Sequence, residues 1–137
     1  MSGLFRLGPR AAGILSVQPA AGADLALPLP AGSRLGSVVA TLVTSAVAGD
    51  RYVSFRVLGS TGAVLWRADS SLAVAASSTQ VYVAYAGAYG YWVAVGSNQQ
   101  GPLPLIALPK GAQLVTVTAG IQAGDQWSIT AAAVEAA

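Results

Sequence analysis

The sequence contains no cysteine and no histidine, and only 9% of its 137 residues are charged. Without cysteine there is no disulfide and no thiolate nucleophile, and without either residue the usual zinc ligands are missing. The absence of histidine also removes the side chain that most often transfers protons near neutral pH. We therefore expect a binding or structural protein rather than an enzyme, with no metal and no cofactor.

Charge is scarce along the whole chain, while 54% of its residues are apolar. The seven basic residues exceed the five acidic ones by only two, and they are scattered singly, which does not predict a nucleic-acid partner. The uncharged tract 70–109 is broken by glycine and proline, whereas a membrane helix needs about 20 mainly apolar residues in a row. The apolar stretch after Arg10 is interrupted by Gln18 and Pro19. We expect neither a membrane partner nor a secretory signal.

Short segments rich in valine, threonine and aromatic residues predict an all-β protein. In residues 52–57, Val53, Phe55 and Val57 alternate with more polar side chains, which is the pattern of a half-buried strand. Turn residues separate the segments at intervals of about 8–12 residues, a spacing typical of sandwiches and barrels. Further strands are predicted at residues 14–17, 25–29, 37–44, 63–67, 80–85, 91–95, 103–108, 114–118 and 127–132, and no helix is predicted.

An internal repeat suggests how these strands are arranged. Residues 29–35 (LPAGSRL) match residues 108–114 (LPKGAQL), and each copy is followed by a Val/Thr-rich strand and then by Ala-Gly-Asp. Both glycine motifs are turn signals that begin a strand. Two such units are what a double Greek key requires, so we expect an antiparallel β-sandwich, jelly-roll-like, with about eight strands. We expect residues 1–23 to form an N-terminal arm and residues 24–137 the sandwich domain.

The five acidic residues do not suggest a catalytic or calcium site. Asp50 and Asp125 lie in the Gly-Asp turns, where a carboxylate commonly accepts backbone hydrogen bonds. Their spacing does not resemble the paired carboxylates of a glycosidase, and there is no loop rich in Asp and Asn. A structural role in turns is therefore the favoured interpretation.

The aromatic tract 82–92 and the arm supply the candidate interface residues. Tyrosine and tryptophan favour interfaces and sugar-binding platforms, which makes Tyr85, Tyr89, Tyr91 and Trp92 candidates. The alternative is that Tyr82 and Trp92 fill the core and that Tyr89 caps a hairpin. In the arm, the apolar side chains would be buried against a neighbouring subunit, a shell protein or the domain itself, while its basic residues pair with acidic groups. These arm candidates are Leu4, Phe5, Arg6, Leu7 and Arg10.

The chain resembles small all-β structural proteins encoded among the virion genes of tailed bacteriophages. The resemblance covers most of residues 25–134 and lies in the Leu-Pro-x-Gly-x-x-Leu motif, the strand GDRYVSFRVL at 49–58 and the closing AGIQAGDQWS at 119–128. It implies a capsid decoration, or cement, protein on the outer face of the head shell. The implied partners are the major capsid protein and further copies of itself, with a homotrimer favoured over a homodimer, and no catalytic residue is implied.

Two other classes of function stay open. A tail, fibre or baseplate module would bind a receptor or carbohydrate, with Tyr89, Tyr91 and Trp92 as stacking surfaces. A hydrolase is the third interpretation, and it would have to use the few acidic residues.

Overall fold

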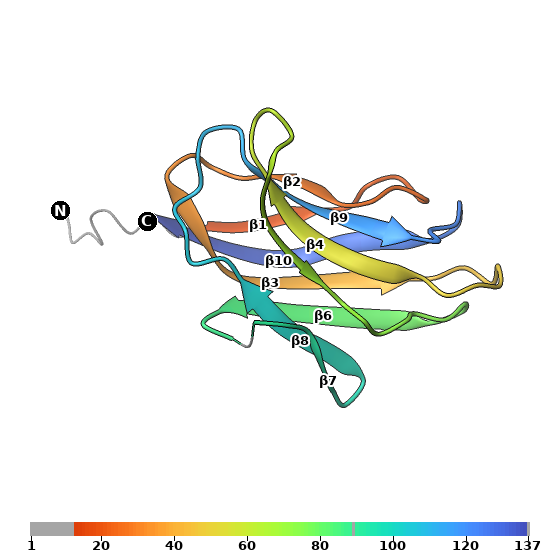
Figure 1. The fold of residues 1–137 in the computed structure, drawn as a ribbon. Helices are drawn as coiled ribbons and strands as arrows, with labels where there is room; N and C mark the ends of the chain where they lie inside the picture. The colour runs from red at the N-terminus through yellow and green to blue at the C-terminus, as the bar shows by residue number, and fades with distance from the viewer. Residues whose placement is uncertain (1–12, 89, 137) are drawn as a thin grey trace.

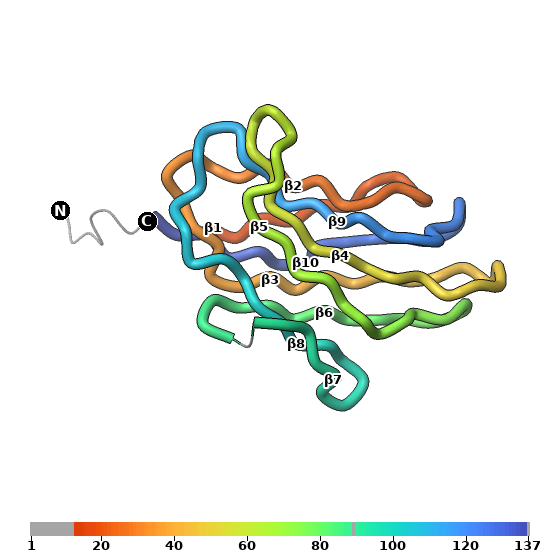
Figure 2. Tube along the Cα trace, in the orientation of Figure 1, coloured from red at the N-terminus to blue at the C-terminus, as the bar shows by residue number. Residues whose placement is uncertain are grey.

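The computed structural model describes residues 13–88 and 90–136, which contain ten strands and no helix. The strands form two sheets that face each other (Figures 1 and 2). The six-stranded sheet has the order β1-β10-β3-β6-β8-β7, and the four-stranded sheet has the order β2-β9-β4-β5. The strands are β1 (Gly13–Val17), β2 (Ala26–Pro28), β3 (Ser33–Val43), β4 (Tyr52–Leu58), β5 (Val64–Asp69), β6 (Thr79–Ala86), β7 (Val93–Val95), β8 (Asn98–Leu103), β9 (Gln113–Ala119) and β10 (Gln126–Ala136).

The strand order is that of a jelly roll with one inserted hairpin. Without β7 and β8, the antiparallel pairs β1–β10, β2–β9, β3–β6 and β4–β5 are nested along the chain, and the two sheets have four strands each. This nesting is how a chain folded back on itself winds into an eight-stranded jelly roll. The predicted all-β sandwich with jelly-roll topology is confirmed.

The β7–β8 hairpin extends the six-stranded sheet in a way that the sequence did not predict. Strand β8 pairs with β6 in parallel, from Val81 opposite Asn98 to Ala86 opposite Leu103. It ends at Leu103 because Pro102 and Pro104 cannot donate hydrogen bonds to a longer ladder. The strand predicted at 103–108 is wrong for this reason, and residues 104–108 are irregular.

The two repeat motifs are equivalent turns. The carbonyl of Pro30 accepts a hydrogen bond from Ser33, and that of Pro109 accepts one from Ala112. Gly32 and Gly111 are the third residues of these turns, with φ of 74° and 82°. Positive φ of this size is the left-handed conformation that favours glycine. Each unit then passes from one sheet to the other, β3 to β4 and β9 to β10. The two copies of the motif thus have the same turn, and both change sheet after the strand that follows.

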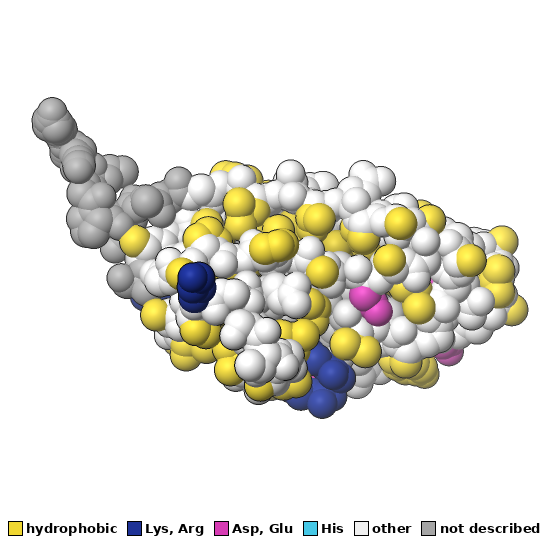
Figure 3. All heavy atoms as spheres, turned by 90° about the horizontal axis from the view of Figure 1, so that it is seen from above, with side chains coloured by type: hydrophobic (Ala, Val, Ile, Leu, Met, Phe, Trp, Pro, Cys, Tyr) yellow, Lys and Arg dark blue, Asp and Glu magenta, His cyan; other side chains and the backbone are white. Residues whose placement is uncertain are grey.

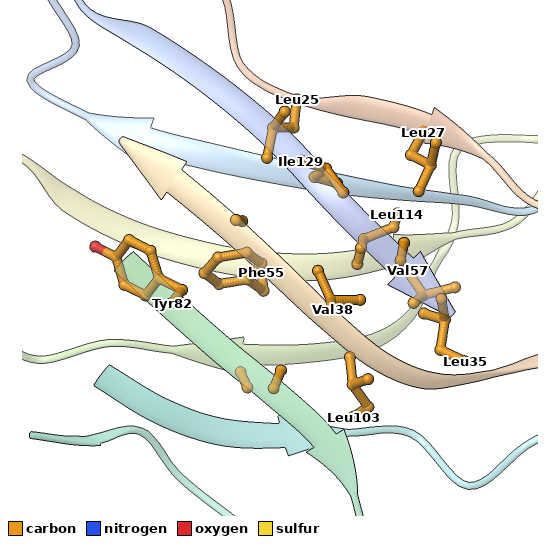
Figure 4. Packing of buried hydrophobic residues seen from close by; sticks show 14 of the residues in the cluster. Leu25, Leu27, Leu35, Val38, Phe55, Val57, Tyr82, Leu103, Leu114 and Ile129 are labelled. Atoms are coloured by element: carbon orange, nitrogen blue, oxygen red, sulfur yellow. The ribbon is translucent and has the colours of Figure 1, made fainter. Parts of the chain in front are cut away.

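The core lies between the sheets. Leucine and valine side chains from both sheets fill most of it, as Figure 4 shows for Leu25, Leu114 and Val38. At one side, four aromatic rings contact each other: Phe55 lies 4.8 Å from Trp92, 5.2 Å from Tyr82 and 5.9 Å from Trp127 between ring centroids. Aromatic clusters of this kind contribute beyond the area they bury, so this side of the core is the more rigidly packed.

Part of the expected arm belongs to the sandwich. Strand β1 lies within residues 1–23 but pairs with β10, from Gly13 opposite Val134 to Val17 opposite Ile129. Leu15 and Val17 also pack against the core. The sandwich therefore includes residues 13–17, and only residues 1–12 of the expected arm lie outside the part that the structure describes.

Candidate interaction surface

An apolar hollow lies beside β5, the edge strand of the four-stranded sheet. Its lining residues come from β5, from the turn after β6, and from the end of β8 with the irregular segment that follows it. None of the described residues that line it is charged; they are Leu65, Trp66, Gly87, Ala88, Gly90, Pro102, Leu103, Pro104, Leu105 and Ile106. We call this feature the β5 hollow.

Several large apolar side chains of the β5 hollow are exposed to solvent. Leu105 is 68% exposed, and Leu65 and Ile106 are each more than 40% exposed. The prolines around Leu105 keep the segment out of the sheet, so its side chains are not drawn into the sandwich. Single exposed apolar residues are common, but a cluster around a hollow marks an interaction site.

Charged side chains are few on the rest of the described surface as well. Figure 3 looks down on the molecule from above the view of Figure 1, where hydrophobic side chains spread over much of the face and the charged ones stand apart. Three ion pairs join charged side chains of the described residues: Arg34–Glu135, Arg51–Asp125 and Arg67–Asp69. A weakly charged surface gives a partner little electrostatic steering, so recognition would depend on apolar contact.

The predicted aromatic candidates do not form one surface. Tyr91 is 63% exposed and follows Gly90, which lines the β5 hollow. Tyr85 is also exposed, but Tyr82 and Ala84 on the same strand point into the core, so Tyr85 lies on the outer face of the six-stranded sheet. Tyr89 lies outside the described residues.

Trp92 is in the core rather than on the surface. Its side chain is buried, it packs on the Cα of Gly101, and its indole Nε1 donates a hydrogen bond to the carbonyl of Ala68. The alternative interpretation, in which Tyr82 and Trp92 fill the sandwich, therefore holds for both residues. Trp92 has no place in a candidate interface because its ring is enclosed by Phe55, Tyr82 and Gly101.

The arm candidates Leu4, Phe5, Arg6, Leu7 and Arg10 lie outside the described residues. Sequence reasoning missed Leu105 and Ile106, because it assigned residues 103–108 to a strand. It placed Leu65 correctly in a strand but had no signal that this side chain is exposed beside them. The signal for Leu105 and Ile106 was present in the sequence PLPLIALP at 102–109, where proline spacing is typical of an exposed loop and the side chains between are apolar.

The acidic side chains are mostly engaged in structural contacts. Asp125 is fully buried and binds the guanidinium of Arg51, with Nε 2.9 Å from Oδ2 and Nη2 3.0 Å from Oδ1. Its carboxylate also accepts hydrogen bonds from the backbone amides of Ser45 and Gln122. Burial by itself raises the pKa of Asp125, but these hydrogen bonds and the Arg51 charge outweigh it and lower the pKa to about 2.

The other carboxylates lie apart from one another. The hydrogen bond from Arg67, followed by the one from Ser54, lowers the pKa of Asp69. Asp24 accepts hydrogen bonds from the hydroxyls of Thr116 and Thr118. Asp50 was expected, like Asp125, to accept backbone hydrogen bonds within its Gly-Asp turn, and its side chain is exposed. Over residues 13–88 and 90–136, no three metal-ligating side chains come together and no helix is long and apolar enough to cross a membrane.

Comparisons with known proteins leave the chain without an assigned family. No protein-family model matches it, and no curated protein matches it. Among solved structures it is similar to a mutant VP2 protein of infectious bursal disease virus in T=1 particles, with a TM-score of 0.31 and 15% sequence identity. The match covers 90% of this chain and 31% of VP2, so the chain spans about a third of that protein's length. At this TM-score the likeness is too weak to support a function, and the fold assignment rests on the strand order.

Proposed function

We propose that this protein is a non-enzymatic structural protein of a virus particle, a decoration or cement protein that binds the outer face of a phage head shell. Its partners would be further copies of itself, with a trimer favoured, and the major capsid protein. The observation that carries this proposal is the β5 hollow, an uncharged concave surface with exposed leucine and isoleucine side chains on a jelly-roll scaffold.

The energetic demand of such a role is modest. A stable interface buries about 800 Å² on each partner, and burial of apolar surface contributes about 25 cal/mol per Å² before the costs of association are subtracted. A cement protein makes the same contact many times around a symmetric shell, so multivalency strengthens weak individual contacts. An apolar surface on a rigid sandwich is sufficient for this purpose.

The use of the acidic residues supports a structural role over hydrolysis. Asp125 and Asp69 are held in their charged forms by arginine, because hydrogen bonds lower the pKa of both. Glu135 pairs with Arg34, and Asp24 binds two threonine hydroxyls. A glycosidase acid requires a carboxyl whose pKa is raised, which is the opposite of the environments of Asp69 and Asp125.

A second candidate function is a tail, fibre or baseplate module that binds a receptor or carbohydrate. The observation that favours it is Tyr91, which is 63% exposed and follows Gly90 of the β5 hollow; exposed tyrosines commonly serve as sugar-stacking platforms. Glycan-array binding by the isolated protein that is lost in Tyr91→Ala would favour this function.

Sedimentation velocity at micromolar concentration tests the proposed self-association. We expect the wild-type protein to sediment as an oligomer and Leu105→Asp to shift it towards monomer, because a charge would be buried in the contact. The matched control is Val47→Asp, another exposed apolar site, in the β3–β4 loop at the other end of the sandwich (Figure 1), which should leave the oligomer intact. A wild-type protein that sediments only as monomer would contradict the proposal.

A further inference from the structure

A second apolar hollow opens beside β1, at the point where the described chain begins. Its lining includes Gly13 and Leu15 of β1, Val134 and Ala136 of β10, and Pro30 and Ala31 of the turn before β3. Leu15 also packs against the core, so the hollow adjoins the hydrophobic core at this end of β1. Among the residues that the structure describes, no charged side chain lines it. We call it the β1 hollow.

The chain itself carries a segment with the chemistry to fill the β1 hollow. Twelve residues precede Gly13, and they include the run Leu4-Phe5-Arg6-Leu7. In an extended segment, Phe5 and Leu7 share one side while Arg6 takes the other, so two apolar side chains would enter and the charge would stay in water. Burying Phe5 alone would remove substantial apolar area from solvent.

The place where β1 begins limits which copy can supply this segment. Gly13 and Leu15 both line the hollow, and β1 runs into the domain from Gly13. To fill its own hollow, a chain must reverse within residues 8–12 and return beside the strand it has just formed. The arm of a neighbouring copy has no such constraint, and Phe5 can lie up to about 26 Å from Gly13 in an extended chain.

We propose that residues Leu4–Leu7 of one copy insert into the β1 hollow of a second copy, so that neighbouring molecules exchange arms. This inference rests on the proposed self-association and identifies a contact that contributes to it. In the assembly a second copy is always within reach, which raises the effective concentration of the arm at its neighbour's hollow.

Cysteine cross-linking gives a direct test, because the natural chain has no cysteine. Phe5→Cys and Ala31→Cys are made as separate proteins, mixed at a concentration where the wild type is oligomeric, and oxidised. We expect a disulfide-linked heterodimer, identified on a non-reducing gel and by mass spectrometry of the linked peptides. The matched control replaces Ala31→Cys with Ala46→Cys, an exposed alanine in the β3–β4 loop, and should yield severalfold less cross-linked product.

The outcomes separate this inference from the proposed function. Suppose the wild type is oligomeric, but the Phe5→Cys and Ala31→Cys pair gives no more cross-linked product than the control pair. This result would overturn the arm exchange and leave the proposed self-association standing. A double variant that closes its disulfide within one molecule would assign the hollow to its own arm and also overturn the inference. Replacing Gly8 and Pro9 by alanine removes the turn that this second arrangement needs, and it should not reduce the intermolecular yield. A monomeric wild type would instead contradict the proposed function.

Discussion

The contact between Gly101 and Trp92 provides a demanding test of the core. A Cβ added at Gly101 would overlap ring carbons Cδ2 and Cε3 of Trp92 and would lie 2.7 Å from Cε2. The backbone at Gly101 is fixed by its parallel pairing with Ala84 on β6, so the glycine side cannot move away freely. Substitution of Gly101 by alanine must therefore displace the indole ring.

The expected cost lies between two known limits. Overpacking a well-packed core costs about 1–3 kcal/mol, and complete loss of a buried tryptophan costs about 3–5 kcal/mol. Displacement of Trp92 would disturb its ring contacts with Phe55 at 4.8 Å and Tyr82 at 5.4 Å, and its hydrogen bond to Ala68. We expect Gly101→Ala to lower the free energy of unfolding by about 2–4 kcal/mol, a large fraction of a typical domain's stability.

Urea unfolding monitored by circular dichroism measures this change without depending on tryptophan fluorescence. The matched control is Gly59→Ala, where an added Cβ would come no closer than 3.7 Å to the side chain of Leu65 and φ is not positive, so its effect should stay within about 0.5 kcal/mol. If the loss acts through the indole, Gly101→Ala should cost little further in a Trp92→Ala background. A Gly101→Ala protein as stable as wild type, or full additivity with Trp92→Ala, would refute this reasoning.

The remaining predictions concern the repeat turns and the buried ion pair. Gly111→Ala should lower the free energy of unfolding by about 1–3 kcal/mol, and by more than Gly32→Ala does. Both glycines have positive φ, but only at Gly111 would an added Cβ also clash with Ser60 in the β4–β5 turn. Equal losses for the two variants in thermal unfolding would contradict this. Asp125→Asn should cost about 3–5 kcal/mol by leaving Arg51 buried without its partner, whereas Asp50→Asn should be nearly neutral in the same urea assay. The folded pKa of Asp125 lies near 2, below its unfolded value, so its contribution of about 2 kcal/mol is complete above pH 4 and is lost as pH falls towards 2. A wild-type stability that is flat from pH 4 to pH 2 would count against that value.

Local patterns predicted most of the fold. The strand predicted at 52–57 is β4, whose alternation places Val53, Phe55 and Val57 in the core. The repeated turn motif predicted the positive φ of Gly32 and Gly111, because the sequence signal and the backbone requirement are both local. The two short matches predicted where β3 and β9 begin, since turn chemistry of this kind begins a strand at a defined place.

Contacts between distant segments could not be predicted in the same way. Asp50 and Asp125 occur in the same Ala-Gly-Asp motif, yet one is exposed and the other is buried against Arg51, 74 residues away in sequence. Burial there depends on the packing of the β3–β4 and β9–β10 loops against each other, as the hydrogen bond from the Ser45 amide to Asp125 illustrates. No periodicity or residue spacing within either loop predicts the contact between them.

The candidate surface was predicted only in part, for a related reason. An aromatic tract has the same composition whether its rings face solvent or the core, and the glycine that admits Trp92 lies nine residues further along the chain. The parallel pairing of β6 with β8 brings Gly101 beneath that ring, and non-local pairing of this kind leaves little trace in a single sequence. Tyr91 was identified as a candidate, while Leu65 and Leu105 needed the fold to bring them together.

The location of this chain in a virus particle tests the central proposal most directly. The measurement is electron microscopy of purified particles labelled with an antibody or gold probe against this chain. The proposed cement function predicts label distributed over the outer face of the head shell, at regular positions. Label confined to the tail, fibres or baseplate, or particles that carry none, would contradict it.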